Sequence, residues 1–77
     1  MENGTKVKLN WKTITSLQYF EDLKDEYKQF VLNNKETVFV VTRDKYRKKN
    51  SPLISLQYEN GTKAGAWLFT EDLLIKQ

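Results

Sequence analysis

The residues of this chain best suited to chemistry are the cations of one short segment, 43–49. Its sequence, RDKYRKK, holds five of the chain's 13 lysines and arginines, with one aspartate and one tyrosine. Cations of this kind neutralise phosphates, and a tyrosine among them offers a face on which a base can stack. The segment therefore predicts a contact with the nucleic-acid backbone that is not sequence-specific. The residues expected to make it are Arg43, Lys45, Tyr46, Arg47, Lys48 and Lys49.

The positive charge of the chain is local. Five cations and one aspartate give segment 43–49 a net charge of +4, whereas the whole chain carries +3, so the other 70 residues sum to −1. The alternative interpretation of the segment is a solvated loop whose charge only keeps the domain in solution.

Three aromatic residues indicate a second kind of site. Exposed tryptophan and tyrosine side chains are typical of protein-binding surfaces. Trp67 lies in a short apolar run in which the sequence does not decide whether the indole points inward or outward. Tyr19 and Tyr27 belong to the apolar stripe of the expected helix, and this stripe is wide for a thin barrel to cover. The alternative hypothesis is thus a protein-interaction module or inhibitor that acts through Trp67, Tyr19 and Tyr27, with the helix or a sheet edge.

The composition argues against an enzyme. The chain has no histidine and no cysteine, which removes the usual general base, the commonest metal ligand and any thiolate nucleophile. Its serines therefore lack a histidine to activate them, and its three glycines form no phosphate-binding motif. No carboxylate spacing suggests a calcium loop. We expect a non-catalytic binding module with no cofactor, no metal and no small-molecule substrate.

The chain of 77 residues is expected to fold as one domain. Ten aromatic residues supply a large apolar area for so short a chain. No stretch approaches the ~20 consecutive apolar residues of a membrane span, and no apolar run follows the first residues. These features predict a cytoplasmic protein that has no membrane contact.

The patterning predicts an α+β fold built on a small bent antiparallel sheet. Residues 6–12 alternate polar and apolar side chains, which is typical of a half-buried strand with Val7, Leu9 and Trp11 inward. Asn60-Gly61 predicts a hairpin through a type I′ turn, with positive φ at both residues. Strands are expected at about 6–12, 37–43, 52–58, 65–70 and 73–76, and one helix is expected at about 16–32, beginning at a capping box on Thr15.

This order resembles an SH3-like small barrel with a helix inserted after the first strand. In that mapping, 43–51 is similar to the second variable loop, 59–65 to the distal hairpin and 70–73 to the helical turn before the last strand. The resemblance implies a five-stranded barrel and a binding role. The tyrosine motif and the Pro-Ser-Asn-Tyr run of proline-peptide binders are missing. The composition is also similar to that of small proteins of phages and other mobile elements.

Overall fold

The computed structural model describes residues 2–42, 52–65 and 67–77 of the chain. The elements follow in the order β1 (Lys6–Leu9), α1 (Trp11–Thr15), the 3-10 turn η1 (Phe20–Asp22), α2 (Asp25–Asn33), β2 (Phe39–Thr42), β3 (Ser55–Tyr58), the 3-10 turn η2 (Glu71–Leu73) and β4 (Leu74–Lys76). The basic segment 43–49 lies outside the described residues.

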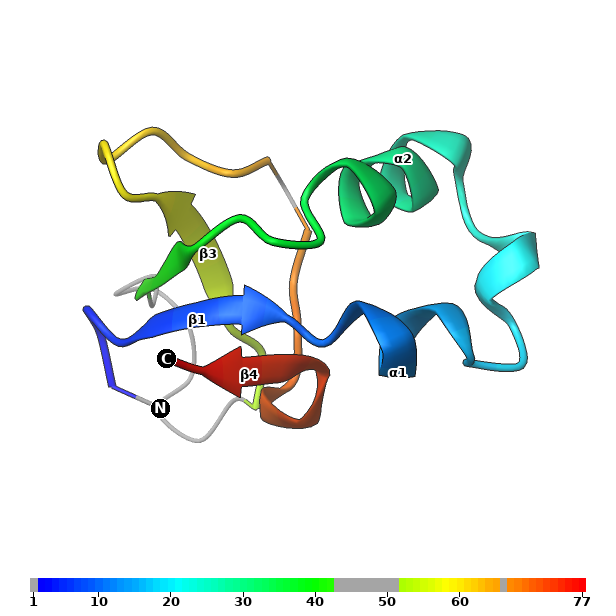
Figure 1. Ribbon diagram of the computed structural model, residues 1–77, viewed down its shortest axis with the longest axis horizontal. Coiled ribbons are helices and arrows are strands. Elements are labelled where there is room, and N and C mark those ends of the chain that lie inside the picture. The colour runs from blue at the N-terminus through cyan, green and yellow to red at the C-terminus, as the bar shows by residue number, and fades with distance from the viewer. Residues whose placement is uncertain (1, 43–51, 66) are drawn as a thin grey trace.

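The four strands form one open antiparallel sheet in the order β3-β2-β1-β4. The first and last strands of the chain therefore lie side by side, with Leu9 opposite Leu74 (Figure 1). Val7 and Leu9 are buried on one face of β1, as the alternation predicted. Phe39 and Val41 are buried on β2, because every second side chain of a strand points to the same face.

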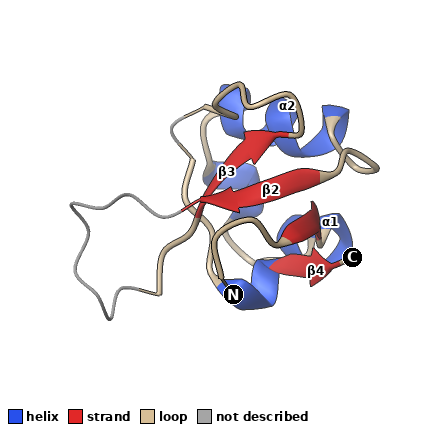
Figure 2. Ribbon diagram, turned by 90° about the vertical axis from the view of Figure 1, so that its left-hand side faces the viewer, coloured by secondary structure: helices blue, strands red, loops and turns tan. Residues whose placement is uncertain are grey.

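The helical segments cover one face of this sheet. Figure 1 shows α1, η1 and α2 gathered on one side of the strands, and in Figure 2, seen from the strand side, the helices lie behind the sheet. The core fills the space between these two layers. Its buried members are Val7, Leu9, Ile14, Phe20, Val31, Phe39, Val41, Ile54, Leu56, Ala64, Phe69 and Leu74.

The single helix expected at 16–32 is wrong. The structure has α1 before this range and α2 in its second half, with a turn between them. The backbone is extended at Leu23 and Lys24, where ψ is 163° and 143°, so the helical path is interrupted there. α2 then begins at Asp25 with two acids in its first turn, where the helix dipole favours them. No helix in the described parts of the chain is long and apolar enough to cross a membrane.

The predicted capping box is also wrong. The Thr15 hydroxyl donates to the carbonyl oxygen of Trp11 at 2.8 Å, and the Ser16 hydroxyl donates to that of Thr13 at 2.9 Å. Both hydroxyls therefore bind carbonyls of the helix that precedes them. Thr15 ends α1 rather than capping the start of a helix.

The first strand is shorter than the predicted 6–12, and Trp11 begins a helix. The pairing with β4 ends at Leu9–Leu74, since the chain before Leu74 is occupied by η2. Asn10 still donates its backbone N–H to the Leu73 carbonyl at 2.8 Å, but no partner strand continues beyond it. Trp11 is half-buried and packs at the edge of the core. The alternation of polar and apolar residues in the sequence therefore extends beyond the end of β1 into the first residues of α1.

The strands predicted at 37–43, 52–58 and 73–76 are present in shortened form as β2, β3 and β4. The strand predicted at 65–70 is not among those that the structure describes. Phe69 of this segment forms an isolated bridge with Ile54, with backbone hydrogen bonds of 2.7 and 2.9 Å. The sheet therefore has four strands and is open, and the predicted five-stranded barrel is not confirmed.

The hairpin after β3 is present, but its turn differs from the prediction. The Gly61 N–H donates to the Tyr58 carbonyl, and the Tyr58 N–H donates to the Thr62 carbonyl, which leaves a three-residue loop. Only Gly61 takes a positive φ, of 90°, whereas Asn60 does not. Asn60 instead accepts the Thr62 N–H on its side-chain oxygen at 2.9 Å. The type I′ turn with two positive φ values is therefore wrong.

Candidate binding groove

The structure brings together the three aromatic residues of the protein-binding hypothesis. Trp67, Tyr19 and Tyr27 line one open groove with a volume of about 300 Å³. We call it the aromatic groove. Its lining residues are Leu17, Tyr19, Leu23, Lys24, Tyr27, Trp67, Leu68 and Leu73. The candidate nucleic-acid residues of segment 43–49, by contrast, lie outside the described residues, so their arrangement stays a prediction.

Two stretches that are distant in the sequence, 17–27 and 67–73, build the aromatic groove. The connection between α1 and α2 supplies one side, the first turns of α2 supply Tyr27, and the chain before and within η2 supplies the other side. Each side contains a phenylalanine that is buried in the core. On the first side it is Phe20 of η1, and on the other it is Phe69, which follows Leu68. Because these anchors belong to the core, the positions of the groove walls are set by the packing of the domain.

Edge-to-face packing fixes the two rings at the centre of the groove. The ring centroids of Tyr27 and Trp67 are 5.3 Å apart at an interplanar angle of 79°. Tyr27 also stacks on Phe69, with centroids 6.2 Å apart. Further contacts join Phe30 to Phe69 and to Phe39. The groove is therefore the outer end of a continuous set of aromatic contacts that reaches the sheet. Each such aromatic pair contributes about 0.5–1.5 kcal/mol to stability beyond the effect of its buried area.

The backbone next to Trp67 is shaped to make room for the indole. Gly65 has a φ of +90°, and a Cβ atom added there would lie 3.3 Å from Trp67 Cδ1 and 3.4 Å from Trp67 Nε1. A residue without a side chain therefore allows the indole to lie close against the main chain. This close approach supports the orientation of Trp67.

The groove carries polar groups that have no partner in the described part of the chain. Neither the Tyr27 hydroxyl nor the Trp67 Nε1–H makes a hydrogen bond there, although both side chains are half-buried. Burial raises the pKa of the Tyr27 hydroxyl, and the nearby Tyr19 adds to the rise. Tyr19 itself is 57% exposed. Partly buried donors of this kind can bind the main chain of a ligand.

Lys24 is the charged residue that lines the groove, and sequence reasoning missed it. No hydrogen bond or ion pair joins its ammonium group to another described residue, whereas Lys28 lies 3.4 Å from an Asp25 carboxylate oxygen. Leu17, Leu68 and Leu73 were missed as well. Their only signal was apolarity, which in a sequence does not distinguish a groove wall from a core position.

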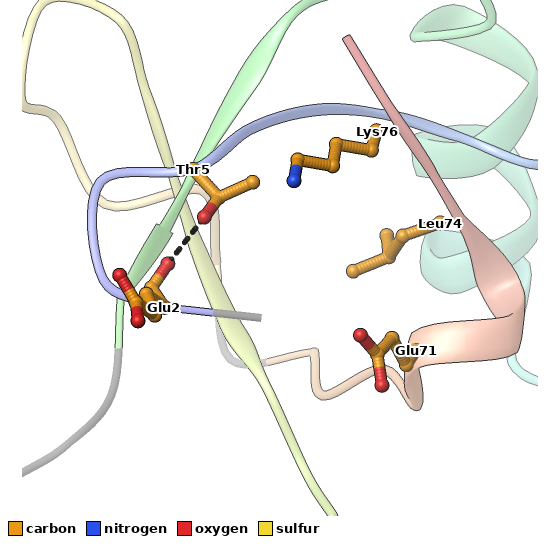
Figure 3. A pocket seen from close by; sticks show the side chains of 5 residues that line it. All are labelled: Glu2, Thr5, Glu71, Leu74 and Lys76. Atoms are coloured by element: carbon orange, nitrogen blue, oxygen red, sulfur yellow. Dashed lines mark hydrogen bonds between the residues drawn. The ribbon is translucent and has the colours of Figure 1, made fainter.

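A second hollow lies between the N-terminal turn and β4 (Figure 3). Leu74, Lys76 and Glu71 extend from β4 and η2 toward Thr5 and Glu2 on that turn, and the hollow has a volume of about 600 Å³. Its charged side chains are exposed and of both signs. Residues 2–42, 52–65 and 67–77 hold no group of three or more side chains able to bind a metal ion. A solvated surface of mixed charge explains this hollow, so the aromatic groove is the stronger candidate site.

The other tryptophan has a different environment. The Lys35 ammonium nitrogen lies 4.4 Å from the centroid of the Trp11 ring, and that of Lys12 lies 5.8 Å from it. A cation over the ring covers part of its exposed face and contributes about 0.5–1 kcal/mol at such a site. Trp11 therefore serves as a matched comparison for Trp67, over which no cation lies among the residues that the structure describes.

No protein family, no curated protein and no solved structure matches the chain in the three comparisons made. The geometry of the aromatic groove and the charge of segment 43–49 are therefore the two features on which a proposed function rests.

Proposed function

We propose that the protein is a non-catalytic module that binds another protein through the aromatic groove. The observation that carries the proposal is that Trp67, Tyr27 and Tyr19 come from separate segments and line one hollow. Tryptophan and tyrosine are the residues most enriched where binding energy concentrates in protein interfaces. Leucines surround them here and provide an apolar wall that excludes water from such contacts.

The size and the chemistry of the groove favour a protein partner over a small molecule. A volume of about 300 Å³ lies at the lower end of the range for ligand pockets, about 300–1,000 Å³. The groove is open, so it leaves an occupant partly exposed, as happens when one or two side chains of a larger partner enter it. The polar groups along it lie beside apolar side chains, which suits an amphipathic chain.

Capture experiments with matched variants test this proposal. A partner captured from the native host by the wild-type protein should be lost with Trp67→Ala and with Tyr19→Ala. It should be retained with Trp11→Phe, which changes the tryptophan outside the groove. Tyr19 is mostly exposed, so its truncation spares the fold even if that of Trp67 does not. Truncating a central aromatic residue should weaken binding by at least about 30-fold.

The purified complex provides a direct readout. In a Trp11→Phe background Trp67 is the sole tryptophan, and a partner seated on it should reduce quenching of its fluorescence by acrylamide. Equal binding by wild type and both groove variants, or unchanged quenching in the complex, would contradict the proposal.

Contact with the nucleic-acid backbone is the second candidate function, and it rests on the sequence alone. The net +4 of segment 43–49 supports it. Binding should weaken steeply with salt, and replacing Arg47, Lys48 and Lys49 together with alanine should abolish a gel shift at low salt. The same triple variant should keep a partner bound at the aromatic groove, so the two functions are separable. The absence of a shift at low salt with the wild-type protein would remove this candidate.

The SH3-like barrel remains part of the proposal. The pairing of β4 with β1 supports it, because it joins the two ends of the chain as closure of a small barrel requires. The bridge between Ile54 and Phe69 supports it too, since it places the segment before η2 next to β3. An origin in a phage or another mobile element is proposed from composition only, and the neighbouring genes would test it.

A further inference from the structure

Lys24 gives the aromatic groove a charge preference. Among the described residues that line the groove it is the one that carries a charge, and its ammonium group has no partner in the described part of the chain. The backbone around it is fixed, because Lys24 is the extended residue directly before α2 and its carbonyl accepts the Lys28 N–H at 3.1 Å. A cation held at the rim of an apolar groove attracts a carboxylate on whatever enters the groove.

Four acids flank Lys24 in the sequence, and none of them belongs to the lining of the groove. They are Glu21, Asp22, Asp25 and Glu26, and all four are exposed. Asp25 is paired with Lys28, whose ammonium group also donates to the Glu21 carbonyl at 3.1 Å. Lys28, the second cation of this region, is therefore engaged on α2, and among the described residues that line the groove Lys24 is the charged one.

The remaining polar groups suit a peptide main chain. The Trp67 Nε1–H can donate to a carbonyl, and the tyrosine hydroxyls of Tyr27 and Tyr19 can donate to a carbonyl or accept an N–H. An extended peptide carries both kinds of group between its side chains. An apolar side chain of the peptide would lie against Leu68 and Leu73 while a neighbouring carboxylate reaches Lys24.

We propose that the occupant of the aromatic groove is a short peptide segment of a partner protein in which an apolar residue is flanked by an aspartate or glutamate. This inference rests on the proposed function and adds to it the chemical class of the ligand. It predicts that the charge of residue 24 decides which peptides bind, whereas the rings decide whether any peptide binds.

A displayed library of random heptapeptides tests this proposal, with the full-length protein as bait. Wild type should enrich peptides with an apolar residue next to Asp or Glu, and Trp67→Ala and Tyr19→Ala should remove that enrichment. Lys24→Glu should reverse the preference toward Lys and Arg, with about a tenfold change in the ratio of acidic to basic peptides, because an attraction becomes a repulsion. Lys12→Glu makes the same charge change outside the groove and should leave the preference as in wild type.

The possible outcomes separate this inference from the function on which it rests. No enrichment that depends on Trp67 and Tyr19 would overturn both. Enrichment that depends on the rings but shows the same charge preference with wild type and Lys24→Glu would overturn the acidic ligand and keep the binding groove. A concentration-dependent dimer in sedimentation that is abolished by Tyr19→Ala would show that a second copy of the chain occupies the groove, and it would also overturn the acidic ligand.

Discussion

Gly65→Ala tests whether close packing against the main chain holds Trp67 in the groove wall. A Cβ atom at Gly65 would lie 3.3 Å from Trp67 Cδ1, which is closer than ordinary van der Waals contact. Gly61 offers a matched control. It has the same φ of +90°, but a Cβ atom there would have nothing within 4 Å. The two substitutions therefore share the backbone strain and differ in the contact with the indole.

The expected loss of stability has two parts. A left-handed backbone costs a residue with a side chain about 1–2 kcal/mol, so both variants should lose this amount. Gly65→Ala must also displace the indole by a few tenths of an ångström, which disturbs the edge-to-face pair of Trp67 with Tyr27. That pair contributes about 0.5–1.5 kcal/mol, and we expect roughly half of it to be lost. For a domain of this size, 1 kcal/mol lowers Tm by about 4–8 °C.

Urea unfolding followed by fluorescence in a Trp11→Phe background measures both contributions to the loss of stability, because Trp67 is then the sole tryptophan. Gly65→Ala should have a lower unfolding free energy than Gly61→Ala, and it alone should shift the emission of folded Trp67. It should also weaken ligand binding at the groove, whereas Gly61→Ala should not. Equal stabilities together with identical emission spectra would refute the idea that the Gly65 backbone positions the indole.

Three further predictions concern the core, the half-buried Tyr27 and the surface. Phe39→Ala should cost about 3–5 kcal/mol, because Phe39 is fully buried at the centre of the sheet. A core of this size rarely supplies more than that, so circular dichroism should show a largely unfolded chain. The raised pKa of Tyr27 predicts that stability falls as the pH rises above 10, since the unfolded chain releases this proton first, and that Tyr27→Phe lessens the fall in pH-dependent urea titrations. Lys6→Ala should change the unfolding free energy by less than about 1 kcal/mol despite an ion pair of 3.4 Å with Glu59, because both side chains are exposed; a larger loss would show that this pair is not a solvated one.

The strands were the predictable part of the fold. Residues 39–42 are β-branched or aromatic throughout, and this composition suits a strand inside a sheet. The alternation of Val7 and Leu9 identified the buried face of β1 correctly. The end of β1 could not be predicted, because it depends on where β4 stops pairing with it. That limit is set by a tertiary contact and leaves no trace in the pattern of residues 6–12.

The helix was mispredicted for a related reason. Apolar residues at the spacing of a helix face are equally compatible with two short helical segments that pack on the same core. Phe20 is buried from η1 and Val31 from α2, although the backbone between them is extended at Leu23 and Lys24. The spacing of the apolar residues thus indicates which side chains face the core. The path of the backbone between them depends on tertiary packing.

The three aromatic residues of the groove could be selected from the sequence, but the way in which the backbone brings them together could not. Tyr19 and Tyr27 were selected as parts of one helix stripe, yet Tyr19 lies in the turn before η1 and reaches the groove from a different segment. Trp67 could not be assigned a face, because the described part of its segment forms one isolated bridge, Ile54–Phe69, and has no strand alternation to follow. Lys24 gave no signal, since a lysine between acids in a predicted helix is an ordinary surface residue.

A small domain leaves some large rings partly exposed simply because it has too much surface for its volume, and this fact alone could explain the groove. The placement of the rings argues against that explanation. The half-buried Trp11 has a lysine over its ring, and Tyr58 packs against Phe39 at a centroid distance of 5.2 Å. Rings exposed only for lack of room would be scattered as these two are, whereas Trp67, Tyr27 and Tyr19 gather in one hollow. The half-buried Tyr27 hydroxyl and Trp67 Nε1–H have no hydrogen-bond partner within the described residues, and Lys24 at the rim has no ion-pair partner among them. Buried donors in proteins usually have a hydrogen-bond partner, so two half-buried donors without one, gathered with three rings in one hollow, favour a ligand at the groove.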